Sequence, residues 1–166
     1  EKFNGDEAKN DTTKSGSIKS GVIKSKRALE NIVNENIGYI KSTAPNVHCL
    51  TNVVTMQDVA NMLLAAGGSA IMAQDIKEME EITQITSATL LNMGVPSDEK
   101  IAAYIAAGKC ANKLGHPVIF DPVGVGASNY RKKCAKDILA NVYPDIIRCN
   151  QEEAKVLLEF KNFGRE

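Results

Sequence analysis

The clearest structural signal in the chain is PVIFDPVGVGA, which occupies residues 117–127. It begins with a short apolar run that is rich in β-branched and aromatic residues, as in a buried strand. The run ends at Asp121, and a turn that contains Gly124 and Gly126 follows it. Apolar residues recur at helical spacing before and after this stretch, so the pattern predicts one strand between two helices.

The same alternation of strand and helix recurs along the chain on both sides of this stretch. Strands that are buried on both faces of a parallel sheet are typically continuous apolar runs, as they are here. The sequence therefore predicts an α/β fold: a mostly parallel sheet of about five strands, covered by helices on both faces and joined by right-handed crossovers. The predicted strands are Val47–Leu50, Ser69–Met72, Thr89–Met93, Pro117–Asp121 and Asp145–Arg148.

The region before the first predicted strand divides into two parts. Residues 1–25 are expected to form a disordered tail, because the run 11–17 (DTTKSGS) has no apolar residue to offset the entropy of ordering. Apolar residues then recur at helical spacing and predict an amphipathic helix over residues 27–42, which Pro45 ends. We therefore expect one folded domain over residues 26–166.

Composition and charge exclude several classes of protein. The chain has 20 basic and 20 acidic residues, and this zero net charge argues against a nucleic-acid partner. No apolar run is long enough to span a membrane, and the first residues do not resemble a signal peptide, so a cytoplasmic location is expected. The four cysteines and two histidines lack the paired spacing of a zinc site or a disulfide framework. The cysteines are interpreted as small core residues.

Polar side chains follow the predicted strands, where ligands bind in parallel α/β sheets. Asn52, Asn92, Asp121 and Arg148 stand at or just after four of these strand ends. Singly, each has an ordinary explanation in a turn or a surface ion pair. Together with the glycine turn, carboxylate, amide and guanidinium groups suit a phosphate and Mg²⁺. The sequence therefore favours a phosphate-using α/β enzyme, without naming its substrate.

Four strings in the chain also resemble a known family. NVHCLTN at 46–52 resembles the VHCxTN opening of hydroxyethylthiazole kinases, and LLAAGGSAIMA at 63–73 is similar to their LLALGASPxMA segment. DPVGVGA at 121–127 is that family's own string, and IRCNQEE at 147–153 resembles its IRGNxxE. The matches run in order from about residue 27 to residue 160.

The resemblance implies a ribokinase-like, three-layer α/β/α fold and a specific activity. Such kinases use ATP and Mg²⁺ to phosphorylate the hydroxyl of 4-methyl-5-(2-hydroxyethyl)thiazole in thiamine biosynthesis and salvage. They are homotrimers with active sites between subunits. By position, the resemblance assigns Met72 and Asn52 to the thiazole pocket, Arg148 and Asn150 to ATP, and Asp121 and Glu153 to Mg²⁺.

The chain departs from the family pattern in two respects. Cys149 stands where the family has glycine, and a side chain there would crowd the turn. The family also continues into a second half with a G-x-G-C motif and the catalytic residue, and these 166 residues contain no such motif. We therefore expect an N-terminal portion of a kinase domain, with no catalytic residue of its own and impaired activity.

The sequence leaves two alternatives to a kinase that acts on the thiazole alcohol. One is a non-catalytic thiazole-binding or assembly protein. The other is a different ribokinase-like enzyme, such as a hydroxymethylpyrimidine kinase, which the VHCxTN-like and DPVGVGA strings disfavour.

Overall fold

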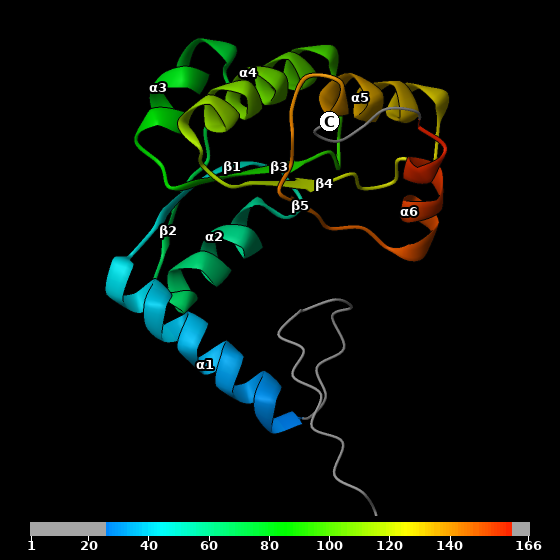
Figure 1. The fold of residues 1–166 in the computed structure, drawn as a ribbon. Coiled ribbons are helices and arrows are strands. Elements are labelled where there is room, and N and C mark those ends of the chain that lie inside the picture. Colours follow the sequence, from blue (N-terminus) through cyan, green and yellow to red (C-terminus); the bar gives the residue numbers. More distant parts are fainter. Residues whose placement is uncertain (1–25, 161–166) are drawn as a thin grey trace, which may run out of the picture.

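A computed structural model describes residues 26–160, so the tail predicted over residues 1–25 lies outside the described residues. Five strands form one parallel sheet in the order β2-β1-β3-β4-β5 (Figure 1). The predicted parallel α/β fold is thus confirmed. The strands are β1 (Asn46–Leu50), β2 (Ser69–Ile71), β3 (Ala88–Asn92), β4 (Val118–Asp121) and β5 (Ile146–Ile147).

The strand order places a switch point between β1 and β3, near the middle of the sheet. The chain moves from β1 to β2 at one edge and then crosses to β3 on the other side of β1. At such a switch point the loops after the two central strands lead away from each other, which opens a ligand-binding crevice at the carboxyl ends. Here those loops are the ones that begin at Thr51 and at Met93.

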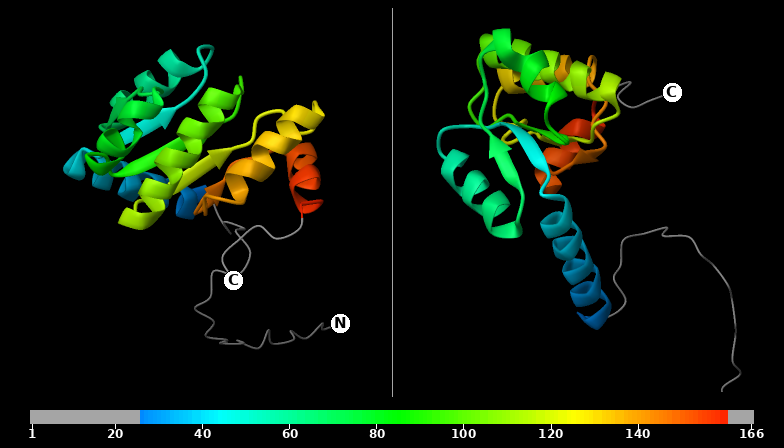
Figure 2. Two further views of the ribbon diagram at one scale, coloured as in Figure 1. Left: turned by 90° about the horizontal axis from the view of Figure 1, so that it is seen from above. Right: turned by 90° about the vertical axis from the view of Figure 1, so that its left-hand side faces the viewer.

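Helices lie on both sides of the sheet, but they cover the two faces unequally (Figures 1 and 2). One face carries α3 (Met79–Gln84), α4 (Asp98–Leu114) and α5 (Asn129–Leu139), and α6 (Gln151–Leu158) lies at the β5 end of the molecule. The other face carries α2 (Met56–Ala66). A 3₁₀ turn, η1 (Ile76–Glu78), precedes α3.

The well-packed core lies between the sheet and the side that carries α3, α4 and α5. Leu91 and Phe120 from the strands and Ala107 and Ile138 from the helices are fully buried there. On the other face α2 has no fully buried residue, and its Met62 is 72% exposed. Helices therefore lie on both faces of the sheet, as predicted, but among the described residues part of the face beside α2 stays open.

The first helix, α1 (Lys26–Thr43), begins and ends within one residue of its predicted bounds. It extends away from the sheet on the side of α2 (Figure 2). Its apolar side chains Leu29, Ile32, Val33 and Ile37 remain 36–47% exposed. Amphipathic spacing thus predicted the helix correctly, but within residues 26–160 little packs against its apolar face. Among the described helices, none combines the length and the apolar character that a membrane span requires.

His48 in β1 is buried and hydrogen-bonded at both ring nitrogens. Its Nε2 lies 3.2 Å from the carbonyl oxygen of Ala73, and its Nδ1 lies 3.0 Å from Oγ1 of Thr83. Because a carbonyl can only accept, Nε2 carries the proton of the neutral ring and Nδ1 accepts from the hydroxyl. Burial lowers the pKa of His48, and the hydrogen bond to Ala73 and the charge of Glu78 oppose that shift only in part.

This lowered pKa predicts a stability that falls in mild acid. Unfolded histidine binds a proton near pH 6.5, whereas folded His48 stays neutral to lower pH, so the free energy of unfolding falls as pH drops through about 6.5. The slope from this group is at most about 1.4 kcal/mol per pH unit. Urea unfolding at pH 7.5 and 5.5 measures it. The change between these two pH values should be smaller in His48→Gln than in the parent chain, and equal changes would contradict the assignment.

Candidate functional site

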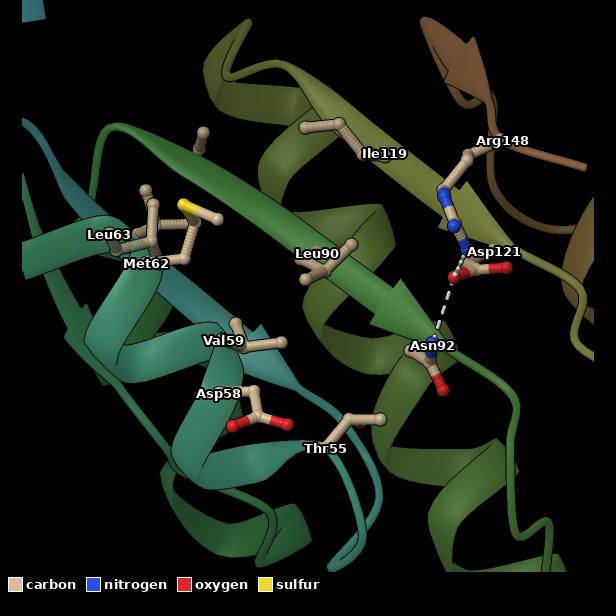
Figure 3. A pocket seen from close by; sticks show the side chains of 12 residues that line it. Thr55, Asp58, Val59, Met62, Leu63, Leu90, Asn92, Ile119, Asp121 and Arg148 are labelled. Atoms are coloured by element: carbon tan, nitrogen blue, oxygen red, sulfur yellow. Dashed lines mark hydrogen bonds and ion pairs between the residues drawn. The ribbon is translucent and has the colours of Figure 1, made fainter. Parts of the chain in front are cut away.

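Four polar side chains at the carboxyl edge of the sheet form a continuous chain of hydrogen bonds. Asn52 Nδ2 donates to Asn92 Oδ1 at 3.0 Å, and Asn92 Nδ2 donates to Asp121 Oδ2 at 2.9 Å. Arg148 Nη1 reaches the same Asp121 oxygen at 2.9 Å (Figure 3). We call these four residues the rim. They follow or end β1, β3, β4 and β5, so the rim crosses the switch point and reaches the far strand.

The β3–β4 register positions the centre of the rim. Asn92 and Asp121 are the last residues of their strands and pair with each other. The Asp121 side chain is only 7% exposed, whereas that of Arg148 is 77% exposed. A buried carboxylate must be compensated by hydrogen bonds or opposite charge, and here an amide and a guanidinium supply both. Asn92 stands at the end of a predicted strand, but the sequence pattern indicated no individual role for it.

The loop after β3 is shaped around the two asparagines of the rim. The Gly94 N–H donates to Asn92 Oδ1 at 3.0 Å. A Cβ atom at Gly94 would collide with the amide of Asn52. Any other residue at this position would therefore disturb the hydrogen bond between Asn52 and Asn92.

The glycine turn, residues 122–127, is bound to the start of α6 through Glu153. Gly124 has a φ of +66°, which favours glycine, and its N–H donates to Glu153 Oε1 at 2.9 Å. Glu153 Oε2 accepts from the N–H of Asn150, whose own side chain caps the helix. In the structure Asn150 and Glu153 form a capping box, and Glu153 also fixes the turn beside Asp121. The resemblance had assigned these two residues to ATP and Mg²⁺.

Sequence reasoning missed Arg131, which lies in α5. Its guanidinium donates to the carbonyl oxygens of Met93, Gly94 and Val123 at 3.2, 2.8 and 2.9 Å. These carbonyls belong to the loops after β3 and β4. No motif marked this residue, because an arginine in an exposed helical stretch is usually only a surface charge.

The residues predicted for the thiazole pocket lie on neighbouring loops. Met72 follows β2 and is half-buried, and Asn52 follows β1 and is buried. Gln74 Nε2 donates to the carbonyl oxygen of Thr51 at 2.8 Å, which joins the two loops. Asn52 turns its amide toward Asn92 within the rim.

A groove of about 550 Å³ lies beside α2 on the open face of the sheet (Figure 3). Its walls are apolar and include Val59, Leu63, Leu90 and Ile119, and its polar end holds Asp58 together with three residues of the rim. This volume is within the range of small-molecule sites. Of the residues predicted for the site, the lining of the groove includes Asp121 and Arg148 but not Met72 or Asn52.

The rim offers few direct ligands for a metal ion. In the described part of the chain, no three His, Cys, Asp or Glu side chains form a cluster that could hold one. Both side-chain bonds to Asp121 reach Oδ2, and no described residue donates to its Oδ1. A single available carboxylate oxygen fits Mg²⁺, which takes one or two carboxylates and keeps several waters or phosphate oxygens.

Comparison with known proteins identifies the family. The model of the hydroxyethylthiazole kinase family matches residues 37–165. The chain belongs to this family. A hydroxyethylthiazole kinase from Clostridium botulinum (strain Alaska E43 / Type E3) is 52% identical over 118 residues, which are 71% of this chain. One from Clostridium acetobutylicum is 48% identical over 126 residues, or 76% of this chain.

A solved hydroxyethylthiazole kinase structure supports the fold. The protein from Pyrococcus horikoshii OT3 is 34% identical and superposes with a TM-score of 0.73 over 77% of this chain and 50% of its own. The chain spans 42% of the C. botulinum kinase and 46% of the C. acetobutylicum kinase. The family resemblance of the four strings is thus confirmed, over about half the length of its relatives.

The rim predicts an unequal effect of two truncations on stability. Asn92→Ala should lower the free energy of unfolding by about 2 kcal/mol, because it leaves the Asn52 amide without its acceptor and Asp121 without its amide donor. Arg148→Ala should cost less than about 1 kcal/mol, because the exposed guanidinium is replaced by water at the carboxylate. Urea unfolding at pH 7.5 compares them, and a larger loss for Arg148→Ala would contradict this account of the rim.

Proposed function

We propose that this chain provides the Mg²⁺·ATP-binding and thiazole-binding residues of a kinase. The kinase would phosphorylate the hydroxyl of 4-methyl-5-(2-hydroxyethyl)thiazole in thiamine biosynthesis and salvage. The observation that carries the proposal is the Asp121–Arg148 pair, 2.9 Å apart, which stands beside a glycine turn in a chain of this family. The relatives are named for this kinase activity, which supports the reaction, and the rim supports the phosphate chemistry.

In this proposal Arg148 binds the ATP phosphates. Its guanidinium is mostly exposed and is bound to Asp121 through Nη1. This bond orients the group and leaves its other nitrogens accessible to a ligand. Guanidinium groups match phosphate oxygens with paired donors. Asn150 contributes by capping α6, whose N-terminal dipole also favours an anion near the rim.

Asp121 and Glu153 would hold the metal ion in the proposed site. When bound, Mg²⁺ would neutralise charge on the β- and γ-phosphates and align them for transfer. Asp121 Oδ1 would be its direct or water-mediated ligand. Both oxygens of Glu153 already accept backbone N–H bonds, so Glu153 would act through a bound water. Catalysis of this kind depends mainly on position and charge rather than on covalent chemistry.

Met72 and Asn52 would line the thiazole pocket. The hydrogen bond between Gln74 and Thr51 supports this assignment, because it keeps the loops of the two residues together. The proposal also includes assembly as a homotrimer in the cytoplasm, and the exposed apolar face of α1 supports association. We assign no catalytic residue within the 166 residues and expect turnover by this chain alone to be weak.

The test is binding by the purified 166-residue chain, measured by titration calorimetry with Mg²⁺·ATP and separately with the thiazole alcohol. Arg148→Ala should weaken Mg²⁺·ATP binding about tenfold or more, because a charged hydrogen bond to phosphate is lost, and should leave thiazole affinity unchanged. Lys133→Ala is the matched control, since it removes an equal charge from an exposed pair with Asp137.

Two outcomes would contradict the proposal. Equal Mg²⁺·ATP affinity in Arg148→Ala and Lys133→Ala would remove Arg148 from the ATP site. Robust phosphorylation of the thiazole alcohol by the 166-residue chain would overturn the expectation that it lacks a catalytic residue.

A further inference from the structure

Arg131 occupies a position in α5 that helix electrostatics disfavour. It lies in the first turn, where its N–H donates to Oγ of the N-cap residue Ser128 at 3.1 Å. A cation near a helix N-terminus is opposed by the helix dipole, and this first turn contains no acidic residue to offset it. Among the described residues no carboxylate forms an ion pair with Arg131. Some other interaction must therefore explain a half-buried guanidinium at this place.

The three carbonyl acceptors of Arg131 supply that interaction. Nη1 binds the oxygens of Met93 and Val123, and Nη2 binds that of Gly94. Met93 and Gly94 follow β3, whereas Val123 follows β4. The planar guanidinium, with donors in fixed directions, can join two loops in this way, but a lysine ammonium on a flexible stem cannot reproduce the same geometry.

Each of the two loops is connected by hydrogen bonds to one of the carboxylates proposed for the metal ion. On the β3 side, Gly94 donates to Asn92, which in turn donates to Asp121. On the β4 side, Val123 precedes Gly124, whose N–H donates to Glu153. Arg131 therefore lies between the hydrogen bonds that orient Asp121 and the one that orients Glu153.

We propose that Arg131 is a positioning residue for the metal–phosphate site. By joining the loops after β3 and β4, it sets the distance and orientation between Asp121 and Glu153. It touches neither carboxylate, and it acts through backbone carbonyls rather than through its charge. This inference rests on the proposed function, because it concerns the same Mg²⁺·ATP site.

The experiment separates positioning from charge with two variants of the full 166-residue chain. Arg131→Lys keeps the charge but cannot join the loops, and Arg131→Gln loses both. Free Mn²⁺ is followed by electron paramagnetic resonance during titration with chain and ATP, and ATP affinity without metal is measured by calorimetry. The quantity compared is the gain in ATP affinity that the metal provides. Lys132→Gln is the matched control, since it removes a charge from the next position of the same helix.

The expected result is that both Arg131 variants lose about tenfold or more of the metal-dependent gain, as changes around metal ligands usually do. Metal-free ATP binding and thiazole affinity should stay within about twofold of the parent chain, and Lys132→Gln should behave as the parent. General misfolding would instead weaken all three ligands together, which would overturn a positioning role. If Arg131→Gln proves unfolded by circular dichroism, Arg131→Lys decides the question.

Two further outcomes distinguish the inference from the proposed function. A parent chain that binds Mn²⁺·ATP, with an Arg131→Lys variant that binds it equally well, would overturn the positioning role and leave the proposed function intact. A parent chain that shows no metal-dependent ATP binding would overturn the proposed function, and this inference with it.

Discussion

The buried carboxylate of Asp121 is the group on which the rest of the site depends. Placing a charge at the end of a central strand with 7% exposure costs several kcal/mol unless its partners are close. The pairing of β3 with β4 brings Asn92 directly opposite, and the short β5 brings Arg148 from the other side. The strand register therefore determines whether the carboxylate is compensated, because a shift of one residue would leave it without its amide donor.

The packing of helices on the two faces of the sheet determines from which side a ligand can reach Asp121. The face under α3, α4 and α5 is tightly packed, so it cannot admit one. The other face is only partly covered by α2, and the groove there runs from apolar strand residues to the rim. An apolar floor with charged groups at one end is the usual form of a small-molecule site. The matched residues make up less than half of two curated relatives, so most of each relative lies outside the matched segment.

The sequence predicted the framework of this molecule well and the connections between loops poorly. Continuous apolar runs located all five strands, since a strand that is buried on both faces is built almost entirely from apolar residues. The polar residues at the strand ends correctly indicated that Asp121 and Arg148 lie close together. The role of Asn92 could have been found from its place opposite Asp121, but only after the strand order was known.

The contacts of Arg131 and the exposure of α1 could not be predicted from the sequence pattern. The contacts of Arg131 with three carbonyls depend on how two loops fold back over α5, and side-chain spacing carries no information on that. The apolar stripe of α1 correctly predicted a helix, but a stripe does not say what covers it, and here Leu29, Ile32 and Ile37 remain exposed. Local periodicity thus specifies elements, whereas the site arises from contacts between their ends.

The most direct test of the central claim is to locate bound metal and phosphate on the chain by nuclear magnetic resonance. Substoichiometric Mn²⁺·ATP is added to the ¹⁵N-labelled chain, and paramagnetic broadening of each backbone amide signal is recorded. The account predicts that signals from residues 121–126 and 148–153 broaden first, while those from α1 and from the α3–α4 side stay sharp. Broadening centred on any other part of the chain, or none at all, would contradict the assignment of the rim as the metal–phosphate site.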